Sequence, residues 1–267
     1  MSRTRGTWST AGIWLGGTAL VAVLALTGLA VMGGDGEAPD APAKGGPSAS
    51  APATPSSGAE PTYDAPDDWT EPERWVALPR GARQDEHGSP VGFPHTTEGA
   101  AAMLAATNTT SIEGETWQSD ELMRVFRSYS GAEDQTERNR AKVQKSGEKT
   151  DAQLAREMGV SPGSPLPAGA YVRSTVVGYQ VITSSPDEVA VWSLSRVVQK
   201  KGELEKEQGS YTRTLVAAQW QDGDWKMTGP ATLRALKAVE GKPKPKMVAP
   251  GDAEYNAAGW TAIREAS

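Results

Sequence analysis

The chain has 267 residues, no cysteine and a formal net charge of -6 at pH 7. The lack of cysteine excludes disulfides, thiolate catalysis and zinc sites that use cysteine. The acidic balance argues against a nucleic-acid-binding surface, which normally carries a basic excess. The length is sufficient for one membrane anchor, one linker and one domain of ordinary size.

The first element of the chain is an uncharged stretch, residues 11–33. A helix of this length is about 34 Å long, which is enough to cross a hydrocarbon core about 30 Å thick. The stretch is therefore predicted to be a transmembrane anchor in contact with membrane lipid. Gly12 and Gly16 are spaced like the pairs of small residues that let two membrane helices associate. The large apolar residues of the anchor include Ile13, Trp14, Leu15, Leu20, Val23, Leu24, Leu26 and Leu29.

The charges on either side of the anchor predict its orientation. Arg3 and Arg5 precede it, whereas the first charges after it are Asp35 and Glu37. The positive-inside rule then places residues 1–10 in the cytoplasm and the rest of the chain outside the cell membrane. A cleaved signal peptide is the alternative, because it also combines a basic start with an apolar core, although that core is usually about 7 to 15 residues long.

A linker and a folded domain follow the anchor. Residues 34–68 are rich in proline, alanine, glycine and serine, and such a composition cannot bury enough apolar surface to offset the entropy of ordering. We expect a disordered tether that holds the domain away from the membrane. An extracytoplasmic α+β domain is predicted for residues 69–240, and a C-terminal linker with one short helix for residues 241–267.

The first half of the domain carries helical patterns. An extended segment at residues 75–79 and a loop at residues 87–94 lead to a helix that starts at Thr96 or Thr97 and ends near residue 108. A second helix is capped by Ser119. Its buried positions follow the i, i+3, i+4, i+7 spacing and are Leu122, Val125, Phe126 and Tyr129. Residues 132–159 are very polar and predict a solvated helix, with Ser146-Gly147 as a candidate break.

The second half carries strand patterns. The segments YVRSTVVGYQVIT, EVAVWSLSRVVQK, SYTRTLVAAQWQ and DWKMTG are rich in β-branched and aromatic residues. Their short connections predict an antiparallel meander, followed by a short helix after Pro230. Asp222-Gly223 favours a two-residue type I′ turn, which places Trp220 directly opposite Trp225. The predicted fold class is therefore α+β, with helices packed on a curved antiparallel sheet.

Candidate chemical groups are few. Asp85, Glu86 and His87 are adjacent in a loop, and adjacent loop residues rarely converge on one metal ion, so we expect them to be solvated. His95 stands at a predicted helix start, where a capping or packing role is expected. No phosphate-binding glycine loop is present. We therefore expect no catalytic, cofactor-binding or metal-binding residues.

Tryptophan is unusually frequent, with nine residues against two phenylalanines. Aromatic faces can bind glycans, but Trp117, Trp192, Trp220 and Trp225 fall in predicted helices and strands, where core packing is expected. The charged loop at residues 200–208 is expected to be solvated, with a contact to a partner protein as the alternative.

The turn segment WQDGDWKMTG and the stretch RWVALPRGARQDEHGSPVGFPHTTEGAAAMLAATN carry a family resemblance. With the order of anchor, tether, helices and sheet, they resemble actinobacterial bitopic membrane proteins that have a nuclear-transport-factor-two-like (cone) domain and are associated with conjugative elements. The layout is also similar to that of assembly-factor subunits of type IV secretion channels. The resemblance covers about residues 69 to 235 and implies a sheet curled around helices, without catalytic residues. The charged stretch at residues 133–149 is longer and more polar than this pattern implies.

These features together predict a non-enzymatic, membrane-anchored structural or assembly component of a complex for conjugation or type IV-like secretion. Its partners would be other subunits or further copies of the chain, and this role predicts a filled interior with an exposed apolar patch. An extracytoplasmic ligand-binding module is the first alternative, and would show an apolar cavity with a few convergent polar groups. An exported hydrolase is the second, and needs a carboxylate or histidine with a strongly shifted pKa in a cleft.

Overall fold

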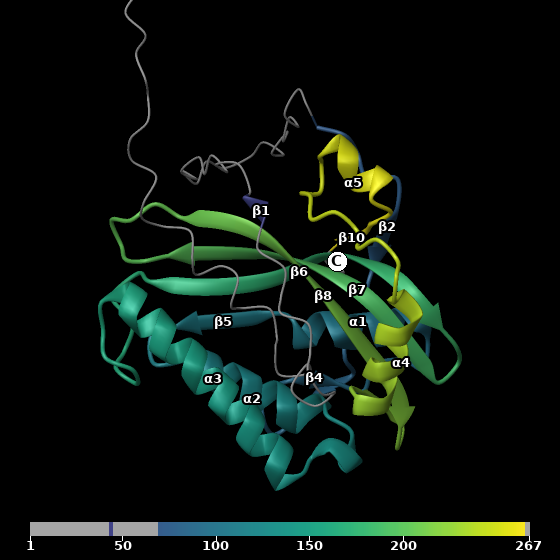
Figure 1. Cartoon of the computed structure of the whole chain (residues 1–267), viewed down its shortest axis with the longest axis horizontal. Helices are drawn as coiled ribbons and strands as arrows, with labels where there is room; N and C mark the ends of the chain where they lie inside the picture. Colours follow the sequence, from purple (N-terminus) through teal and green to yellow (C-terminus); the bar gives the residue numbers. More distant parts are fainter. Residues whose placement is uncertain (1–42, 45–68, 265–267) are drawn as a thin grey trace, which may run out of the picture.

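The computed structural model describes residues 43–44 and 69–264, in which helices pack on a curved, mostly antiparallel β-sheet (Figure 1). The α+β class predicted from the sequence is confirmed. The helices are α1 (Thr97–Thr107), α2 (Gln118–Tyr129), α3 (Glu137–Met158), α4 (Gly229–Val239) and α5 (Ala253–Ala257), and a 3-10 turn covers Ala132–Asp134. The strands are β1 (Ala43–Lys44), β2 (Trp75–Ala77), β3 (Arg83–Gln84), β4 (Pro90–Val91), β5 (Thr110–Glu113), β6 (Tyr171–Ser184), β7 (Glu188–Lys200), β8 (Gln208–Gln221), β9 (Asp224–Lys226) and β10 (Thr261–Arg264).

The predicted anchor, residues 11–33, lies outside the described residues, as does the tether apart from β1. Within the described ranges, no helix combines the length and the apolar character needed to span a membrane. The sequence pattern did not predict β1, which pairs with β8.

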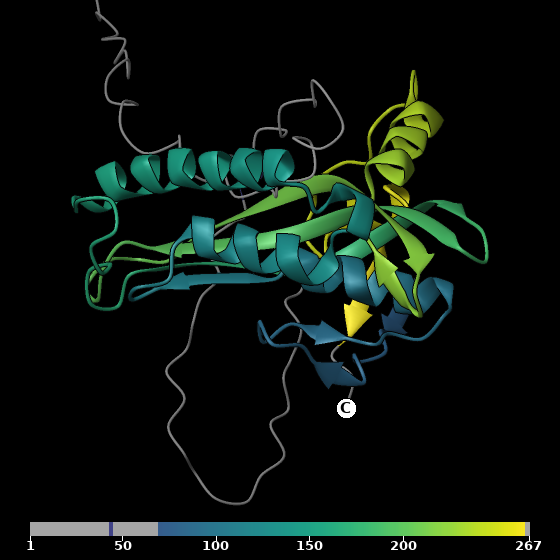
Figure 2. The same ribbon diagram turned by 90° about the horizontal axis from the view of Figure 1, so that it is seen from below.

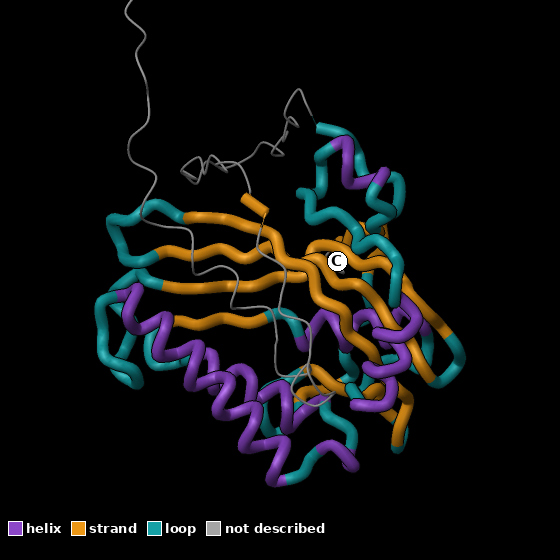
Figure 3. Tube along the Cα trace, viewed as in Figure 1, coloured by secondary structure: helices purple, strands orange, loops and turns teal. Residues whose placement is uncertain are grey.

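The sheet is built around β6, β7 and β8, which form the predicted meander. Along the sheet the strand order is β1-β8-β7-β6-β10-β2, with β5 added beside β6 and β9 beside β8. Register shifts in β6 follow Val176 and Val181, and such bulges bend a strand and increase its twist. In Figure 3 the strands and the helix pair α2 and α3 occupy separate regions of the domain.

The two faces of β7 pack against different helices, because successive side chains of a strand point to opposite faces. Val189 and Val191 belong to the large apolar cluster that includes α1 and α2. Ala190 faces the other way and packs with Ala231 and Ala235 of α4. The sheet is thus covered on both faces over part of its length.

The helix starts are set by side chains that accept hydrogen bonds from the first free backbone N–H groups. Thr96 caps α1, as predicted, because its hydroxyl accepts a hydrogen bond from the N–H of Gly99 at 3.0 Å. The start of α2 differs from the expected cap at Ser119. Asp151 of α3 accepts hydrogen bonds there from the backbone N–H groups of Gln118 and Ser119. Burial raises the pKa of Asp151, against the effect of these hydrogen bonds.

Three further expectations are corrected or refined. The candidate break at Ser146-Gly147 does not occur, because α3 runs without interruption through both residues and lies beside α2 (Figure 2). The expected loop at residues 87–94 contains β4, which pairs with β3. Beyond the short helix α5, the C-terminal region also supplies β10, which runs antiparallel to β6 and parallel to β2.

The predicted hairpin register is confirmed. Trp220 pairs with Trp225, and Gln221 with Asp224. Asp222 and Gly223 have φ angles of 52° and 81°, as a type I′ turn requires at both central positions.

Candidate functional site: a pocket beside helix α1

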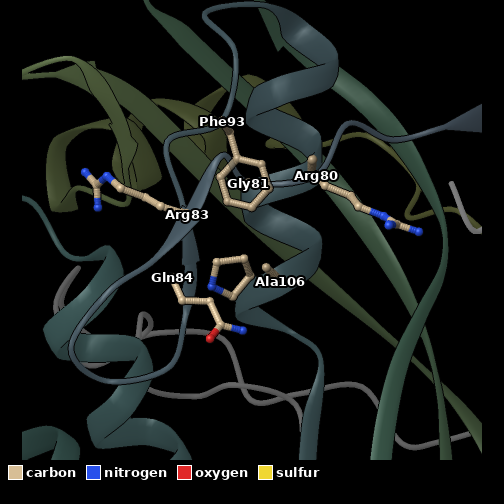
Figure 4. A pocket seen from close by; sticks show the side chains of 8 residues that line it. Arg80, Gly81, Arg83, Gln84, Phe93 and Ala106 are labelled. Carbon is tan, nitrogen blue, oxygen red and sulfur yellow. The ribbon is translucent and has the colours of Figure 1, made fainter.

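A pocket of about 390 Å³ lies between the β3–β4 hairpin and α1 (Figure 4). Its lining residues are Arg80, Gly81, Arg83, Gln84, Pro90, Phe93, Ala102 and Ala106. The volume falls within the range of about 300 to 1,000 Å³ that is typical of ligand sites. Most of this lining is apolar, and the polar groups come from the hairpin side.

The pocket stays open because its walls carry small residues. Ala102 and Ala106 are four residues apart on α1, so they lie on one face of the helix. Gly81 passes close to β4, where a Cβ atom would lie 2.8 Å from the backbone nitrogen of Val91. A larger residue at Gly81 would therefore push the hairpin away from its present position.

The turn of the hairpin is fixed by a partly buried hydrogen-bond network. Oδ1 of Asp85 accepts hydrogen bonds from the backbone N–H groups of His87 and Ser89, both at 2.9 Å. Arg124 of α2 donates to the hydroxyl of Ser89 at 2.8 Å. The hydroxyl of Tyr129 donates to the carbonyl of Pro90 at 2.8 Å, and burial raises the pKa of Tyr129 to about 12, so it keeps its proton at physiological pH.

The other end of the hairpin is held by strand β9. The N–H of Gly92 donates to Oδ2 of Asp224 at 3.2 Å. The indole N–H of Trp225 donates to the carbonyl of Pro94 at 2.8 Å. Phe93 lies between these two contacts and is 4% exposed. Because both ends of the hairpin are attached to the core, the pocket is preformed.

Two arginines, Arg80 and Arg83, line the pocket, and the described residues of its lining include no acidic side chain. In Figure 4 their side chains extend to opposite sides of the pocket. Among the described residues, Arg83 has no ion-pair partner within reach, whereas Arg173 and Arg234 pair with Glu113 and Glu188.

We predict that the hairpin is sensitive to acid because its turn depends on the carboxylate of Asp85. Burial raises the pKa of Asp85. The hydrogen bonds that its carboxylate accepts together lower this pKa by a larger amount, so the net shift is downward. A carboxylate with a lowered folded-state pKa stabilises the fold above its unfolded-state pKa of about 3.9, and this contribution is lost as the pH falls through the folded-state pKa. We expect Asp85→Asn, which keeps an oxygen acceptor, to reduce the free energy of unfolding more at pH 7 than at pH 3. Urea unfolding at the two pH values measures this difference, and an equal cost at both would contradict the assigned role.

A second cluster surrounds His95 on the way into α1. Its imidazole lies parallel to the ring of Trp220, with centroids 4.0 Å apart and an angle of 8° between the planes. Nε2 of His95 lies 2.9 Å from Oδ1 of Asp187 in the β6–β7 turn. A hydroxyl–hydroxyl hydrogen bond of 2.8 Å between Thr97 and Ser184 also joins the start of α1 to the end of β6. The packing role expected for His95 is confirmed, and the aspartate partner was not foreseen.

The other residues considered from the sequence do not form a site in the part of the chain that the structure covers. Asp85 uses its carboxylate on the hairpin backbone, and no cluster of three possible metal ligands occurs among the described residues. Trp117 and Trp225 are buried in the core, as expected. The loop between β7 and β8 exposes Leu204 almost completely. Other exposed large apolar residues, Trp69, Val181 and Leu233, belong to different parts of the chain.

Sequence reasoning did not find the pocket. On one side of α1, Ala102 and Ala106 leave open space. The signal for the pocket that was available in the sequence was the excess of small residues on a face of α1 other than the one that packs on the sheet. In comparisons with known proteins, no family model, no curated protein and no solved structure matches this chain.

Proposed function

We propose that this protein is a non-enzymatic, membrane-anchored assembly component that binds another protein of its complex through the pocket beside α1. The observation that carries the proposal is the preformed pocket, with an apolar lining, arginines at its sides and a hairpin fixed at both ends. A rigid apolar pocket with a polar border is the usual anchor point of a protein interface. The anchor and tether expected from the sequence would hold this site outside the membrane.

Packing inside the domain supports a role in binding proteins over one in binding a ligand inside a cone. Buried side chains of α1, including Met103 and Leu104, fill the space against the helix-facing side of β7 and β8. The described pocket lies elsewhere, between α1 and the hairpin. A small-molecule ligand for that pocket is the alternative proposal, since its volume suits one.

The geometry gives little support to a hydrolase. His95 and Asp187 resemble the base and orienting acid of a triad, but a nucleophile must lie within hydrogen-bond reach of the base. Among the described residues, no hydroxyl forms a hydrogen bond with His95. The stacking on Trp220 accounts for its position.

Site-specific photo-crosslinking of the full chain in its native membrane tests the proposal. A benzophenone amino acid at Ala106, in the pocket, is expected to give a covalent adduct with another membrane-complex subunit, because the partner would contact this position. Leu233 is the matched control, since it is 51% exposed on α4, which packs on the opposite face of the sheet. The adduct is identified by mass spectrometry.

Equal adducts from Ala106 and Leu233, or none from either position, would overturn the assembly role of the pocket. The anchor is tested separately by alkaline extraction. Full-length protein should stay in the membrane pellet, and recovery of a mature form that lacks the first thirty or so residues would contradict the anchor.

A further inference from the structure

We propose that the loop between β7 and β8 of one copy of this chain inserts Leu204 into the pocket beside α1 of a second copy. This inference rests on the proposed function and names the partner that the pocket takes. It draws on the shape of the loop, the lining of the pocket and the charges at the edge of each.

The loop presents Leu204 at the corner of a tight turn. The backbone N–H of Glu205 donates to the carbonyl of Gly202 at 3.1 Å, which closes a β-turn with Glu203 and Leu204 at its two central positions. Leu204 is 99% exposed, so its own chain buries almost none of its apolar surface. A single exposed leucine is common on protein surfaces. At the tip of a turn, however, a partner can enclose the side chain from several sides.

The base of the loop is held in place by its own chain. A Cβ atom at Gly169 would lie 2.8 Å from the Cα of Glu203, so the segment before β6 packs directly against the turn. The hydroxyl of Tyr171 donates to the carboxylate of Glu207, and the guanidinium of Arg196 lies 3.8 Å from the same carboxylate. A loop that is already ordered loses little conformational entropy when a partner binds its tip.

The pocket has the volume and the lining to accept a leucine side chain. An engineered protein cavity of about 150 Å³ is enough to bind benzene. The pocket measures about 390 Å³, which leaves room for the side chain and for part of the turn that carries it. Phe93 and Ala102 are buried, and Pro90 and Ala106 add apolar surface. Transfer of Leu204 from water onto this lining is therefore favourable.

The charges at the edges of the two surfaces are complementary. Glu203 and Glu205 flank Leu204, and both are exposed. Arg83 of β3 is exposed at the edge of the pocket, and Figure 4 shows its guanidinium group directed outward. With Leu204 in the pocket, one of the two glutamates can accept paired N–H donors from Arg83. Arg83 is the one cation that this contact requires.

The loop and the pocket lie in different parts of the domain. In Figure 1 the β7–β8 loop is at the left end of the long strands, away from β4 and α1. Because the paired strands keep the loop there, it meets the pocket of another copy and not its own. A contact that joins two different surfaces of the same protein repeats from copy to copy, and it builds either a ring or an open chain.

Crosslinking of the full chain in its native membrane tests the inference. The chain has no cysteine, so each introduced cysteine is unique. Gln84→Cys, at the pocket, and Lys206→Cys, in the loop, are co-expressed as two differently tagged chains and treated with a short bis-maleimide. We expect a covalent dimer that contains one chain of each kind. Lys237→Cys, exposed on α4, replaces the loop variant as the control and should give about tenfold less mixed dimer.

The contribution of Leu204 is measured in the same assay. Leu204→Asp in the Lys206→Cys chain should lower the yield of mixed dimer about tenfold, because a carboxylate would lose its hydration on the apolar lining. Leu233→Asp is the matched control, since it is the same change at a leucine that is 51% exposed on α4. Its yield should stay within about twofold of the parent pair. Far-UV circular dichroism checks that both variants are folded.

An exchange of charges tests the pairing at the edge. Arg83→Glu in the Gln84→Cys chain should lower the yield about threefold, because it places like charges opposite each other. Combining it with Glu203→Arg and Glu205→Arg in the loop chain should restore most of the yield. Failure of the exchange to restore any yield would contradict the assigned pairing.

A mixed dimer no more abundant than that of the Lys237→Cys control, or one unaffected by Leu204→Asp, overturns the inference. If the photo-crosslinker at Ala106 then gives an adduct with a different subunit, the proposed function stands and a second copy is the wrong occupant. An adduct between Ala106 and the loop of another copy supports both. A mixed dimer without any adduct at Ala106 overturns insertion into the pocket.

Discussion

Replacing Trp225 by alanine is expected to lower the free energy of unfolding by about 4 kcal/mol, since buried Trp→Ala changes typically cost about 3 to 5 kcal/mol. Trp225 is fully buried in the large apolar cluster. It also contacts Trp220 edge to face, with ring centroids 5.3 Å apart, and donates to the carbonyl of Pro94. The variant loses apolar burial, an aromatic contact and a hydrogen bond together. Urea unfolding followed by far-UV circular dichroism measures the change.

Trp220→Ala is the matched control on the same hairpin. Its ring is only partly buried and packs on His95 at the domain surface, so we expect a cost of about 1 to 2 kcal/mol from partial burial and lost stacking. Equal costs for the two variants would mean that the hairpin contributes as a unit and that Trp225 is not its main core residue.

The same substitution should also affect the pocket. With Trp225 removed, the carbonyl of Pro94 keeps its hydrogen bond from the N–H of Thr96 but loses the one from the indole, and the segment that carries Phe93 is then joined to β9 by the contact between Gly92 and Asp224. A pocket that depends on this attachment would bind its partner protein more weakly in Trp225→Ala even at temperatures where the domain stays folded. We therefore expect stability and partner binding to fall together in this variant.

Local patterns predicted the elements near that hairpin well. The register of Trp220 and Trp225 depends on a two-residue turn, whose φ angles Asp222 and Gly223 can adopt at little cost. The start of α1 at Thr96 depends on a hydroxyl three residues from the N–H that it caps. Each of these features is decided within a few residues of sequence.

Long-range contacts decided the features that the sequence did not predict. The pocket depends on the approach of Gly81 to Val91 and on the attachment of the hairpin to α2 and β9, which join residues far apart in the chain. Likewise, β10 becomes a strand because β6 and β2 offer paired edges on either side of it. A short segment such as Thr261–Arg264 has no periodic signal of its own.

Gly147→Ala is expected to destabilise the protein by about 1 to 2 kcal/mol, although intrinsic helix propensity alone favours alanine over glycine by about 1 kcal/mol. Gly147 lies in the middle of α3, where a Cβ atom would be 2.5 Å from the Cα of Ser119 in α2. The obstructing atom belongs to the backbone, so no side-chain rotation relieves the contact. The two helices would have to separate.

That separation would also weaken the cap of α2. The N–H groups of Gln118 and Ser119 donate to Asp151, one helical turn beyond Gly147, and these contacts need the close approach of the helices. Gly209→Ala is the control, because a Cβ atom there meets no atom within 4 Å, and its stability should be unchanged within about 0.5 kcal/mol. If Gly147→Ala proved as stable as the wild type, the gain in helix propensity would fully offset the contact with Ser119. The glycine would then mark a tolerated weak point of α3 instead of the place where α2 and α3 meet.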